Sequence, residues 1–433
     1  MSLLVTLDRA LAAPLRAHEW REGELRSFTL RDAVAGAPRP AEAGEYLVAR
    51  APDVTTLWSQ LRFALEKKRP LAILPPSTPA EEAILLRQLS PSPPAAAVAL
   101  FTSGTTGEPK AVFHAEASLL ASSAQLARAF PGNAPTASLL SPWAMAGIAF
   151  HCLLPAQRRS SLAFGTAPFL DWAASAGKVF RDLEIELLTL SPTHLEMLLR
   201  AGIEPAWRGR ILSLTAPLKR THRDALALLA GREASEIYGM TEAAGPVLLD
   251  GASLGAELRL SGAGELEIKG SQLMMGYSAA GRFEPAPEWH ATGDLFACEG
   301  SRFHHQARLR ELIDVGGRKI APRMLEETLE SLGEIAECLA FPVQLGATER
   351  PGVAYVRKPQ CTLGRDELSD RVERHLRERL SPELRPRLWL EVDAVPRLAG
   401  GKPDRRGART RWGYPAKEPR AGTSSSGSSG PRR

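Results

Sequence analysis

Residues 95–110 read AAAVALFTSGTTGEPK and join an apolar run to a loop rich in Gly, Ser and Thr. The run from Ala95 to Phe101 predicts a buried strand. The glycines let the backbone turn tightly and aim N–H groups at an anion, and Lys110 supplies a compact positive charge. An ordinary flexible connection has a similar composition, but the order of these residues favours a loop that holds phosphate groups.

The loop is not a Walker A sequence. Gly104 and Gly107 are three residues apart, and Ala111 follows Lys110 where Walker A has Ser or Thr. The chain also lacks a G-x-G-x-x-G fingerprint. The sequence therefore argues against a P-loop nucleotidase and against a dinucleotide-binding fold.

Helix and strand signals alternate around this loop up to about residue 300. Residues 54–65 carry leucines every four positions and predict a helix, residues 71–74 predict a short buried strand, and residues 81–89 predict another helix. This alternation predicts an α/β fold. The stretch between Arg128 and Arg158 has no charged side chain and is long enough to cross a bilayer. Its four prolines instead predict a buried strand, turn and helix.

The texture changes after residue 300. Residues 308–323 are charged and strand-like, and residues 324–332 predict a helix. Residues 365–380 place four apolar side chains on one helical face amid charges. We expect a small α+β unit here, followed by a disordered tail at residues 421–433, either native or an artificial appendage.

Composition sets wider bounds. The chain has 433 residues, 44% apolar and 24% charged, which is typical of a globular protein of two or three domains. Its net charge of +5 is spread along the chain, unlike the basic stripe of a nucleic-acid surface. Four isolated cysteines predict neither a disulfide framework nor a structural zinc site. The N-terminus is a poor signal peptide, because Asp8 and Arg9 interrupt its apolar run. We therefore expect a cytoplasmic protein that binds no nucleic acid and spans no membrane.

Three further segments carry chemistry. Residues 236–242, EIYGMTE, offer an aromatic face, a hydroxyl and a carboxylate, which suit a base, a phosphate and a hard cation. Asp294 in ATGD is a natural acceptor for a vicinal diol. Lys402 lies on a glycine-rich loop that can enter a site and leave it. Taken alone, a core tyrosine before a capping threonine, and a common T-G-D turn, explain the first two segments equally well.

In this order, TSGTTGEPK, EIYGMTE, ATGD, residues 308–320 and residues 396–406 resemble the signature segments of the adenylate-forming superfamily. Its members include acyl- and aryl-CoA synthetases, firefly luciferase and peptide-synthetase adenylation domains. The resemblance implies a large, multi-layer α/β domain of stacked sheets and helices over residues 1–307, shortened at its N-terminal side. It also implies a small α+β domain over residues 311–415 that moves on a hinge and carries the catalytic lysine.

The resemblance also implies residue roles. Lys402, Thr241 and Glu242 would be catalytic, with Glu242 holding Mg²⁺. Arg310 would be the hinge pivot, and Gly317 would lie beside the thiol. Nucleotide binding is implied for Thr102, Ser103, Gly104, Thr105, Thr106, Gly107, Lys110, Thr215, Ala216, Pro217, Tyr238, Gly239, Asp294 and Arg308. Of these, Tyr238 would stack on adenine, and Asp294 would accept the ribose hydroxyls.

The chain departs from the family pattern at a few positions. Leu214 and Thr215 replace paired glycines in the turn before the adenine pocket. Ala307 replaces a glycine before the hinge arginine, and Pro403 replaces an aliphatic residue after Lys402. The implied cofactors are ATP, Mg²⁺ and CoA, or a carrier-protein phosphopantetheine in place of CoA.

The implied reaction is ATP-dependent activation of a carboxylic acid, followed by thioester formation. The acid pocket would include Trp143, Met145 and Gly147. Residues 141–147 contain no acidic side chain to pair with an α-ammonium group, which favours an aryl or short-to-medium acyl acid over an amino acid. The Arg-rich small domain also suits an acidic acyl carrier protein as acceptor. A non-catalytic nucleotide-binding homologue remains an alternative, given the departures from the family pattern.

Overall fold

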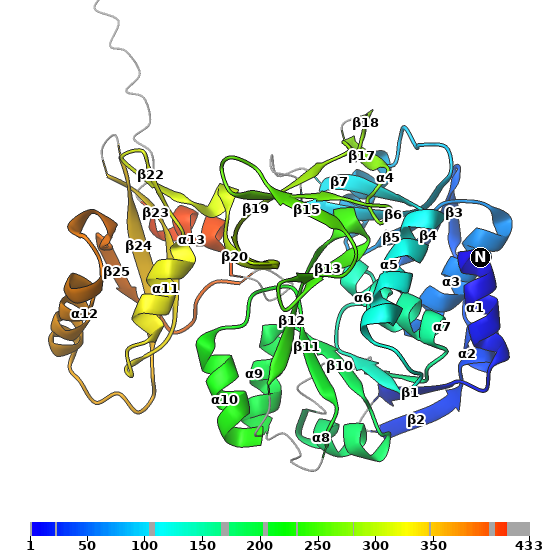
Figure 1. Ribbon diagram of the computed structural model, residues 1–433, viewed down its shortest axis with the longest axis horizontal. Helices are drawn as coiled ribbons and strands as arrows, with labels where there is room; N and C mark the ends of the chain where they lie inside the picture. The colour runs from blue at the N-terminus through cyan, green and yellow to red at the C-terminus, as the bar shows by residue number, and fades with distance from the viewer. Residues whose placement is uncertain are drawn as a thin grey trace, which may run out of the picture. The chain divides into compact units, whose positions relative to one another are not determined.

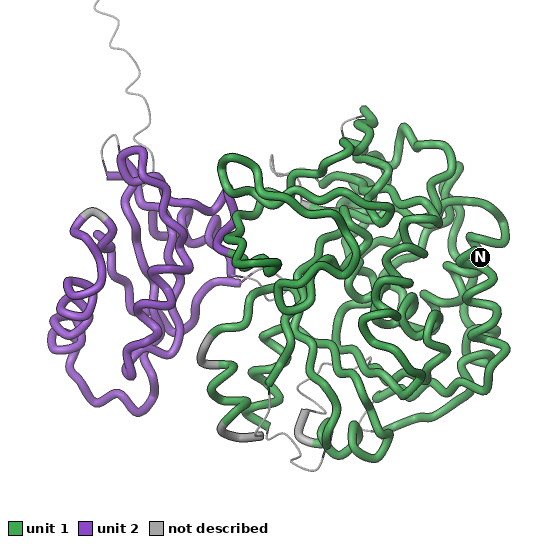
Figure 2. The backbone as a smooth tube through the Cα atoms, in the orientation of Figure 1, with its two compact units in different colours: residues 1–305 green, residues 306–433 purple. Residues whose placement is uncertain are grey.

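In the computed structural model the described residues are 2–21, 24–103, 109–165, 173–201, 207–230, 233–279, 281–345, 348–397 and 403–413. The chain divides into two compact units, residues 1–305 and residues 306–433 (Figure 2). The expected tail, residues 421–433, lies outside the described residues.

A nine-stranded sheet forms one side of the first unit (Figure 1). Its inner strands run parallel, and its two ends are closed by antiparallel pairs. In sheet order the strands are β14 (Ala252–Ser253), β13 (Gly245–Leu249), β12 (Ala234–Met240), β11 (Arg210–Ser213), β10 (Leu187–Leu190), β8 (Thr136–Ser138), β9 (Leu162–Gly165), β1 (Arg16–Arg21) and β2 (Glu24–Thr29). Fully buried runs such as residues 187–190, LLTL, explain the parallel pairing, since such strands are covered on both faces.

A seven-stranded sheet forms the other side. In sheet order its strands are β18 (Arg282–Pro285), β17 (Gly276–Ala279), β7 (Pro109–Ala115), β6 (Ala96–Ser103), β5 (Leu71–Leu74), β4 (Tyr46–Arg50) and β3 (Ala41–Ala43). A smaller sheet has the order β15 (Glu257–Leu260), β16 (Glu265–Lys269), β19 (His290–Glu299) and β20 (Arg302–Arg308). Strands from both of these sheets carry residues of the candidate site.

A layer of helices lies between the two large sheets. Its members are α1 (Leu3–Ala12), α2 (Leu30–Gly36), α3 (Val54–Lys67), α5 (Glu116–Ala129), α6 (Met145–Ile148), the π-helix η1 (Ala149–Leu153) and α7 (Leu154–Arg158). One apolar cluster joins these helices to both sheets and includes Leu71 of β5 and Leu162 of β9. The indole Nε1 of Trp58 donates to the carbonyl of His151 at 2.8 Å and ties α3 to η1.

Other helices cover the outer faces of the sheets. Helix α4 (Pro79–Arg87) packs Leu85 into a cluster with Phe113 on the seven-stranded sheet. Helices α8 (Ala173–Asp182), α9 (Pro192–Ala201) and α10 (Arg220–Ala230) cover the nine-stranded sheet. The first unit therefore alternates layers of helices and sheets, and the expected α/β architecture of stacked sheets is confirmed.

The second unit has a three-stranded sheet of β23 (Ile335–Leu345), β24 (Thr348–Arg357) and β25 (Leu388–Glu391). A hairpin of β21 (Ile313–Val315) and β22 (Arg318–Ile320) precedes it. Helices α11 (Pro322–Glu330) and α12 (Arg365–Arg379) share one apolar cluster with the sheet, and α13 (Arg405–Trp412) contributes Ala408 to another. Short 3₁₀ turns are η3 (Thr241–Ala243) in the first unit, and η4 (Leu309–Glu311) and η5 (Pro382–Leu384) in the second.

Most local predictions are confirmed. Residues 54–65, 71–74 and 365–380 form α3, β5 and α12, and Leu368, Val372 and Leu376 are the buried face of α12. Helix α4 begins at Pro79, two residues before the expected start, because Thr78 and Glu81 form a capping box. The charge-free stretch folds as β8 and the α6–η1–α7 run. Across the described ranges, no helix is long and apolar enough to span a membrane.

Candidate functional site

The β6–β7 hairpin holds the ends of the candidate phosphate loop. Thr102 pairs with Lys110 and Ser103 pairs with Pro109 in antiparallel register. Gly104, Thr105, Thr106 and Gly107 lie outside the described residues, as does the side chain of Ser103. The pairing of β6 with β7 fixes the two ends of the loop. Lys110, at the C-terminal end of the loop, is half-buried.

Strand β12 leads directly into the turn η3, and this junction carries the second predicted segment. Tyr238 and Gly239 are on β12, and Thr241 and Glu242 are in η3. A Cβ on Gly239 would lie 2.4 Å from the carbonyl oxygen of Gly245, so only glycine fits against β13. The close approach explains why a glycine precedes the turn.

The backbone of η3 is anchored on both sides. The Nε2 of His114, on β7, donates to the carbonyl of Thr241 at 2.7 Å. The N–H of Met274 donates to the carbonyl of Glu242, also at 2.7 Å. Burial lowers the pKa of His114 to about 4, so the ring is neutral near pH 7 and donates from Nε2. The turn that presents Thr241 and Glu242 is thus fixed by two different segments.

Tyr238 and Asp294, which the sequence placed in separate segments, are in direct contact. The Tyr238 hydroxyl donates to Oδ2 of Asp294 at 2.9 Å. Asp294 is buried on β19, and the ring of Tyr238 packs edge-on against Phe296 at 4.9 Å between centroids. These neighbours hold Tyr238 in place, and this fixes the aromatic face beside the carboxylate.

A second contact forms around Glu242. The hydroxyl of Tyr277, on β17, donates to Oε1 of Glu242 at 2.8 Å, and Nζ of Lys110 lies 5.1 Å from the centroid of the Tyr277 ring. His290, on β19, has its ring centroid 6.4 Å from that of Tyr277. Burial lowers the pKa of His290, and the negative charges of Glu242 and Glu265 oppose that shift.

Sequence reasoning missed His114, Tyr277 and His290. Each is a single residue in a strand, without a local motif to mark it. Tyr277 joins the site through the pairing of distant strands, because it lies opposite Val112 when β17 pairs with β7. The signal that could have found His290 is its place immediately before the ATGD segment.

The turn after β11 contains Thr215, Ala216 and Pro217. Thr215 has φ of 78°, the left-handed region that glycine adopts without strain and a β-branched residue rarely enters. The N–H of Leu218 donates to Oε1 of Glu236 at 2.7 Å and ties the turn to β12. The position where the family has glycine therefore keeps a glycine-like backbone in this chain.

The predicted acid-pocket residues surround the first turn of α6. Met145 is buried in the central cluster, and Trp143 packs against that cluster. A Cβ on Gly147 would lie 1.9 Å from the carbonyl oxygen of Ser141, so the helix can approach that segment only with glycine there. Their role toward an acid stays a prediction.

The remaining predicted residues lie in or beside the second unit. Arg308 ends β20, Arg310 is exposed in η4, and Gly317 has φ of 87° in the β21–β22 hairpin. Lys402 lies outside the described residues, but its flanks are described. Arg397 and Pro403 form an isolated antiparallel bridge, and the N–H of Asp404 donates to the carbonyl of Pro396 at 2.8 Å. The segment that carries Lys402 is thus closed at its base.

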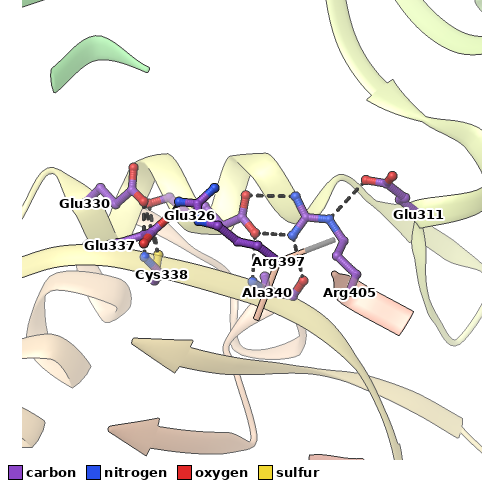
Figure 3. Close-up of polar contacts among 8 residues, drawn as sticks. All are labelled: Glu311, Glu326, Glu330, Glu337, Cys338, Ala340, Arg397 and Arg405. Carbon is purple, nitrogen blue, oxygen red and sulfur yellow. Dashed lines mark hydrogen bonds and ion pairs between the residues drawn. The ribbon is translucent and has the colours of Figure 1, made fainter. Parts of the chain in front are cut away.

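Arg405 anchors this base within the unit (Figure 3). Its Nε lies 3.0 Å from Oε2 of Glu311, its Nη2 lies 3.1 Å from Oε2 of Glu326, and its Nη1 donates to the carbonyl of Ala340 at 3.1 Å. Burial lowers the pKa of Arg405, but the charges of Glu326 and Glu311 outweigh it and raise the pKa overall. Sequence reasoning did not single out Arg405.

The number of carboxylates near one another limits the kind of metal site that the described residues could form. Among them, no group of three or more His, Cys, Asp or Glu side chains is placed to enclose a metal ion. Magnesium in nucleotide sites is held by one or two carboxylates together with phosphates and water, so a single carboxylate such as that of Glu242 is chemically sufficient.

These features agree with a family match. Residues 47–258 match the family of AMP-binding enzymes. The chain therefore carries an AMP-binding domain. The matched range includes the β6–β7 hairpin, β12 and η3, whereas Tyr277, Asp294 and the second unit lie outside it.

Individual relatives extend the likeness. A sulfoacetate–CoA ligase of Cupriavidus necator is 29% identical over 61% of this chain, but the match spans only 58% of that protein. A probable CoA ligase of Humulus lupulus is 28% identical over 94% of this chain and 83% of its own length. The o-succinylbenzoate CoA synthetase of Bacillus subtilis, solved with its acyl-adenylate intermediate, has a TM-score of 0.70 at 18% identity, covering 94% of this chain and 97% of that one. That structural likeness shows the fold of an AMP-binding enzyme along nearly the whole chain.

Proposed function

We propose that the protein is an acid–thiol ligase, which activates a carboxylic acid with ATP as an acyl-adenylate and transfers the acyl group to CoA. The observation that carries the proposal is that two segments supply one hydrogen-bonded pair and one pair that interacts through charge. The β12–η3 junction carries Tyr238 and Glu242, and β19 carries Asp294 and His290. Tyr238 contacts Asp294, and the charge of Glu242 acts on His290. The same two segments therefore carry groups suited to adenosine and groups suited to a metal-bound phosphate.

In the first half-reaction, a carboxylate oxygen of the acid attacks the α-phosphorus of ATP, and the bond to pyrophosphate breaks. Tyr238 would stack on adenine, Asp294 would accept the ribose hydroxyls, and the β6–β7 loop with Lys110 would hold phosphate oxygens. Thr241 would donate to the α-phosphate. Glu242 would hold Mg²⁺, which neutralises the charge that develops on the phosphate oxygens.

In the second half-reaction, a thiolate sulfur attacks the acyl carbon, and AMP leaves with the electron pair of the broken C–O bond. We propose that the second unit carries Lys402 to the carboxylate and the α-phosphate for the first step. Arg310 would then act as the pivot that withdraws Lys402 and brings Gly317 toward the thiol arm, with Arg308 on the ribose.

For the acid, we propose an aryl or short-to-medium acyl carboxylate. The support is that residues 141–147 have no carboxylate to pair with an amino group, while the partly buried Trp143 supplies an apolar side chain. CoA is the proposed acceptor because the CoA ligases named above are relatives. A carrier-protein phosphopantetheine presents the same thiol arm and is the acceptor to test against it.

The first experiment is carboxylate-dependent exchange of pyrophosphate into ATP, with a panel of aryl, short-chain and long-chain acids and amino acids. We expect exchange with aryl or short-to-medium acyl acids. Acyl transfer to CoA and to a loaded carrier protein then identifies the acceptor. Absence of exchange with every acid, in protein shown to bind ATP, would favour the non-catalytic alternative instead.

Lys402→Ala tests the role of the C-terminal loop. The exchange rate should fall by about 10²–10³-fold, as for the loss of one donor that stabilises a charged transition state. Binding of the acid should change little. Lys358→Ala, another lysine of the same unit, is the matched control and should exchange at the wild-type rate. An unimpaired Lys402→Ala variant would show that the loop has been assigned wrongly.

A further inference from the structure

Tyr277 has two contacts in the proposed site that no motif predicts. Its hydroxyl end meets Glu242 at 2.8 Å, and the cationic Nζ of Lys110 lies over its ring face at 5.1 Å. A tyrosine hydroxyl is neutral near pH 7, so it acts as an uncharged donor toward Glu242. Tyr277 therefore stands between the candidate metal ligand and the lysine of the candidate phosphate loop.

The backbone around Tyr277 is fixed by that same site. The N–H of Met274 donates to the carbonyl of Glu242, and the N–H of Met275 donates to the carbonyl of Phe113 on β7, both at 2.7 Å. Gly276 has φ of 153°, and a Cβ there would lie 2.2 Å from the carbonyl oxygen of Glu284. Because only glycine fits, this segment has little freedom to shift. The phenol is thus presented from a rigid strand.

We propose that Tyr277 is a positioning residue that orients the Glu242 carboxylate for the metal ion and keeps Lys110 for the phosphates. This inference rests on the proposed function. The hydroxyl engages Oε1 of Glu242, which fixes the carboxylate rotamer and leaves Oε2 for the metal. A neutral donor does this without cancelling the negative charge. The aromatic ring of Tyr277 meanwhile attracts the Lys110 ammonium through a cation–π interaction, so that Lys110 does not form an ion pair with Glu242.

Two substitutions separate these effects. Tyr277→Phe removes the hydroxyl and keeps the ring beneath Lys110, whereas Tyr277→Leu removes both. A hydrogen bond to a charged group is worth roughly a factor of 10–100 in an equilibrium constant. Tyr277→Phe should therefore raise the Mg²⁺ concentration that gives half-maximal exchange by about 10-fold or more, with the rate at saturating Mg²⁺ within about 3-fold of wild type. Tyr277→Leu should raise the Mg²⁺ requirement further than Tyr277→Phe and should also lower the rate at saturating Mg²⁺ more.

The control is Tyr46→Phe in the same sheet. The Tyr46 hydroxyl donates to the carbonyl of Leu89 at 3.0 Å, in a contact that serves only the fold. This variant should lower the melting temperature without changing the Mg²⁺ requirement. A purely structural role for Tyr277 would give the same pattern, so an unchanged Mg²⁺ requirement in Tyr277→Phe overturns the proposal.

A second readout does not need turnover. Binding of Mn²⁺ to the full-length protein with a non-hydrolysable ATP analogue is followed by the paramagnetic signal of free Mn²⁺. Tyr277→Phe should weaken Mn²⁺ binding by about 10-fold, and equal binding overturns the proposal. If wild type binds Mn²⁺ with the analogue but exchanges with no acid, the proposed activity fails while the role of Tyr277 is still decided by this measurement. If the wild-type protein binds no Mn²⁺ with the analogue, the inference fails as well.

Discussion

Glu242 in the first unit and Glu326 in the second are both carboxylates held in place, but by partners of different charge. Glu242 receives one hydrogen bond from the neutral hydroxyl of Tyr277. Glu326 receives hydrogen bonds from the guanidinium of the half-buried Arg405 and from the N–H of Ala340 at 2.8 Å (Figure 3). The first carboxylate is oriented and keeps its negative charge, so it can attract a cation. The second is neutralised, so it joins α11 to the start of α13. The charge of the partner distinguishes a potential ligand from a structural support.

Removing the guanidinium tests the structural member of this pair. Arg405→Met should lower the free energy of unfolding by about 3–5 kcal/mol, because Glu326 and Glu311 lose their shared cation. Denaturant unfolding followed by fluorescence measures the change. Arg371→Met, which breaks a pair with Glu334 whose arginine side chain is 55% exposed, should cost less than about 1 kcal/mol. Similar losses in the two variants would remove the distinction between the carboxylates.

Neutralising Glu242 tests the other member. Glu242→Gln keeps the shape of the side chain and its acceptor toward Tyr277, but it removes the charge. The rate of pyrophosphate exchange should fall by about 10²–10³-fold, while the melting temperature stays near that of wild type. Glu326→Gln should show the reverse pattern, with lower stability and an exchange rate nearer to wild type. A large loss of stability in Glu242→Gln would place Glu242 among the structural carboxylates.

The two units should also differ in how their stability depends on pH. His151 is buried in η1, its Nε2 donates to the carbonyl of Leu140 at 2.7 Å, and burial lowers its pKa to about 4. Below pH 6.5 the unfolded imidazole binds a proton that the folded one does not, so stability falls as the pH falls toward 4. At pH 5 the loss is about 2 kcal/mol for this side chain. Arg405 in the second unit, which is half-buried, stays protonated throughout this range.

His151→Gln isolates this contribution. The amide can still donate to Leu140 but does not titrate. The free energy of unfolding of the variant, measured at pH 7 and pH 5, should differ less between the two pH values than that of wild type, by about 2 kcal/mol. Equal pH dependence in the variant and wild type would assign the acid sensitivity to other groups.

The sequence predicted features that depend on local pattern. The leucine stripe of α3, the apolar run of β5 and the amphipathic face of α12 follow from the spacing of apolar residues, and the structure confirms them. The resemblance supplied Tyr238, Glu242 and Asp294 one by one, but not that Tyr238 and Asp294 touch. That contact depends on how β12 and β19 are brought together, which no local pattern records.

The missed residues share a physical reason. Tyr277, His114 and Arg405 act through partners far away in the sequence, and each looks ordinary in its own segment. A tyrosine at a strand start favours burial, a histidine between apolar residues favours a core position, and an arginine beside another arginine favours the surface. Only the register of the sheets and the packing of α13 show that these side chains meet carboxylates or the turn of the candidate site.

Strand β1 has a consequence for the order in which the chain is assembled. Its N-terminal residue Arg16 donates from its N–H to Oγ of Ser161 at 3.1 Å, 145 positions later, and Ala17 pairs in parallel with Leu162. At ribosomal rates of about 5–20 residues per second, the partner strand is made roughly 7–30 s after β1. During that interval β1 and β2 can pair with each other, but their open edge has no partner from this sheet. Early synthesis therefore leaves this strand edge without its native partner until β9 is made.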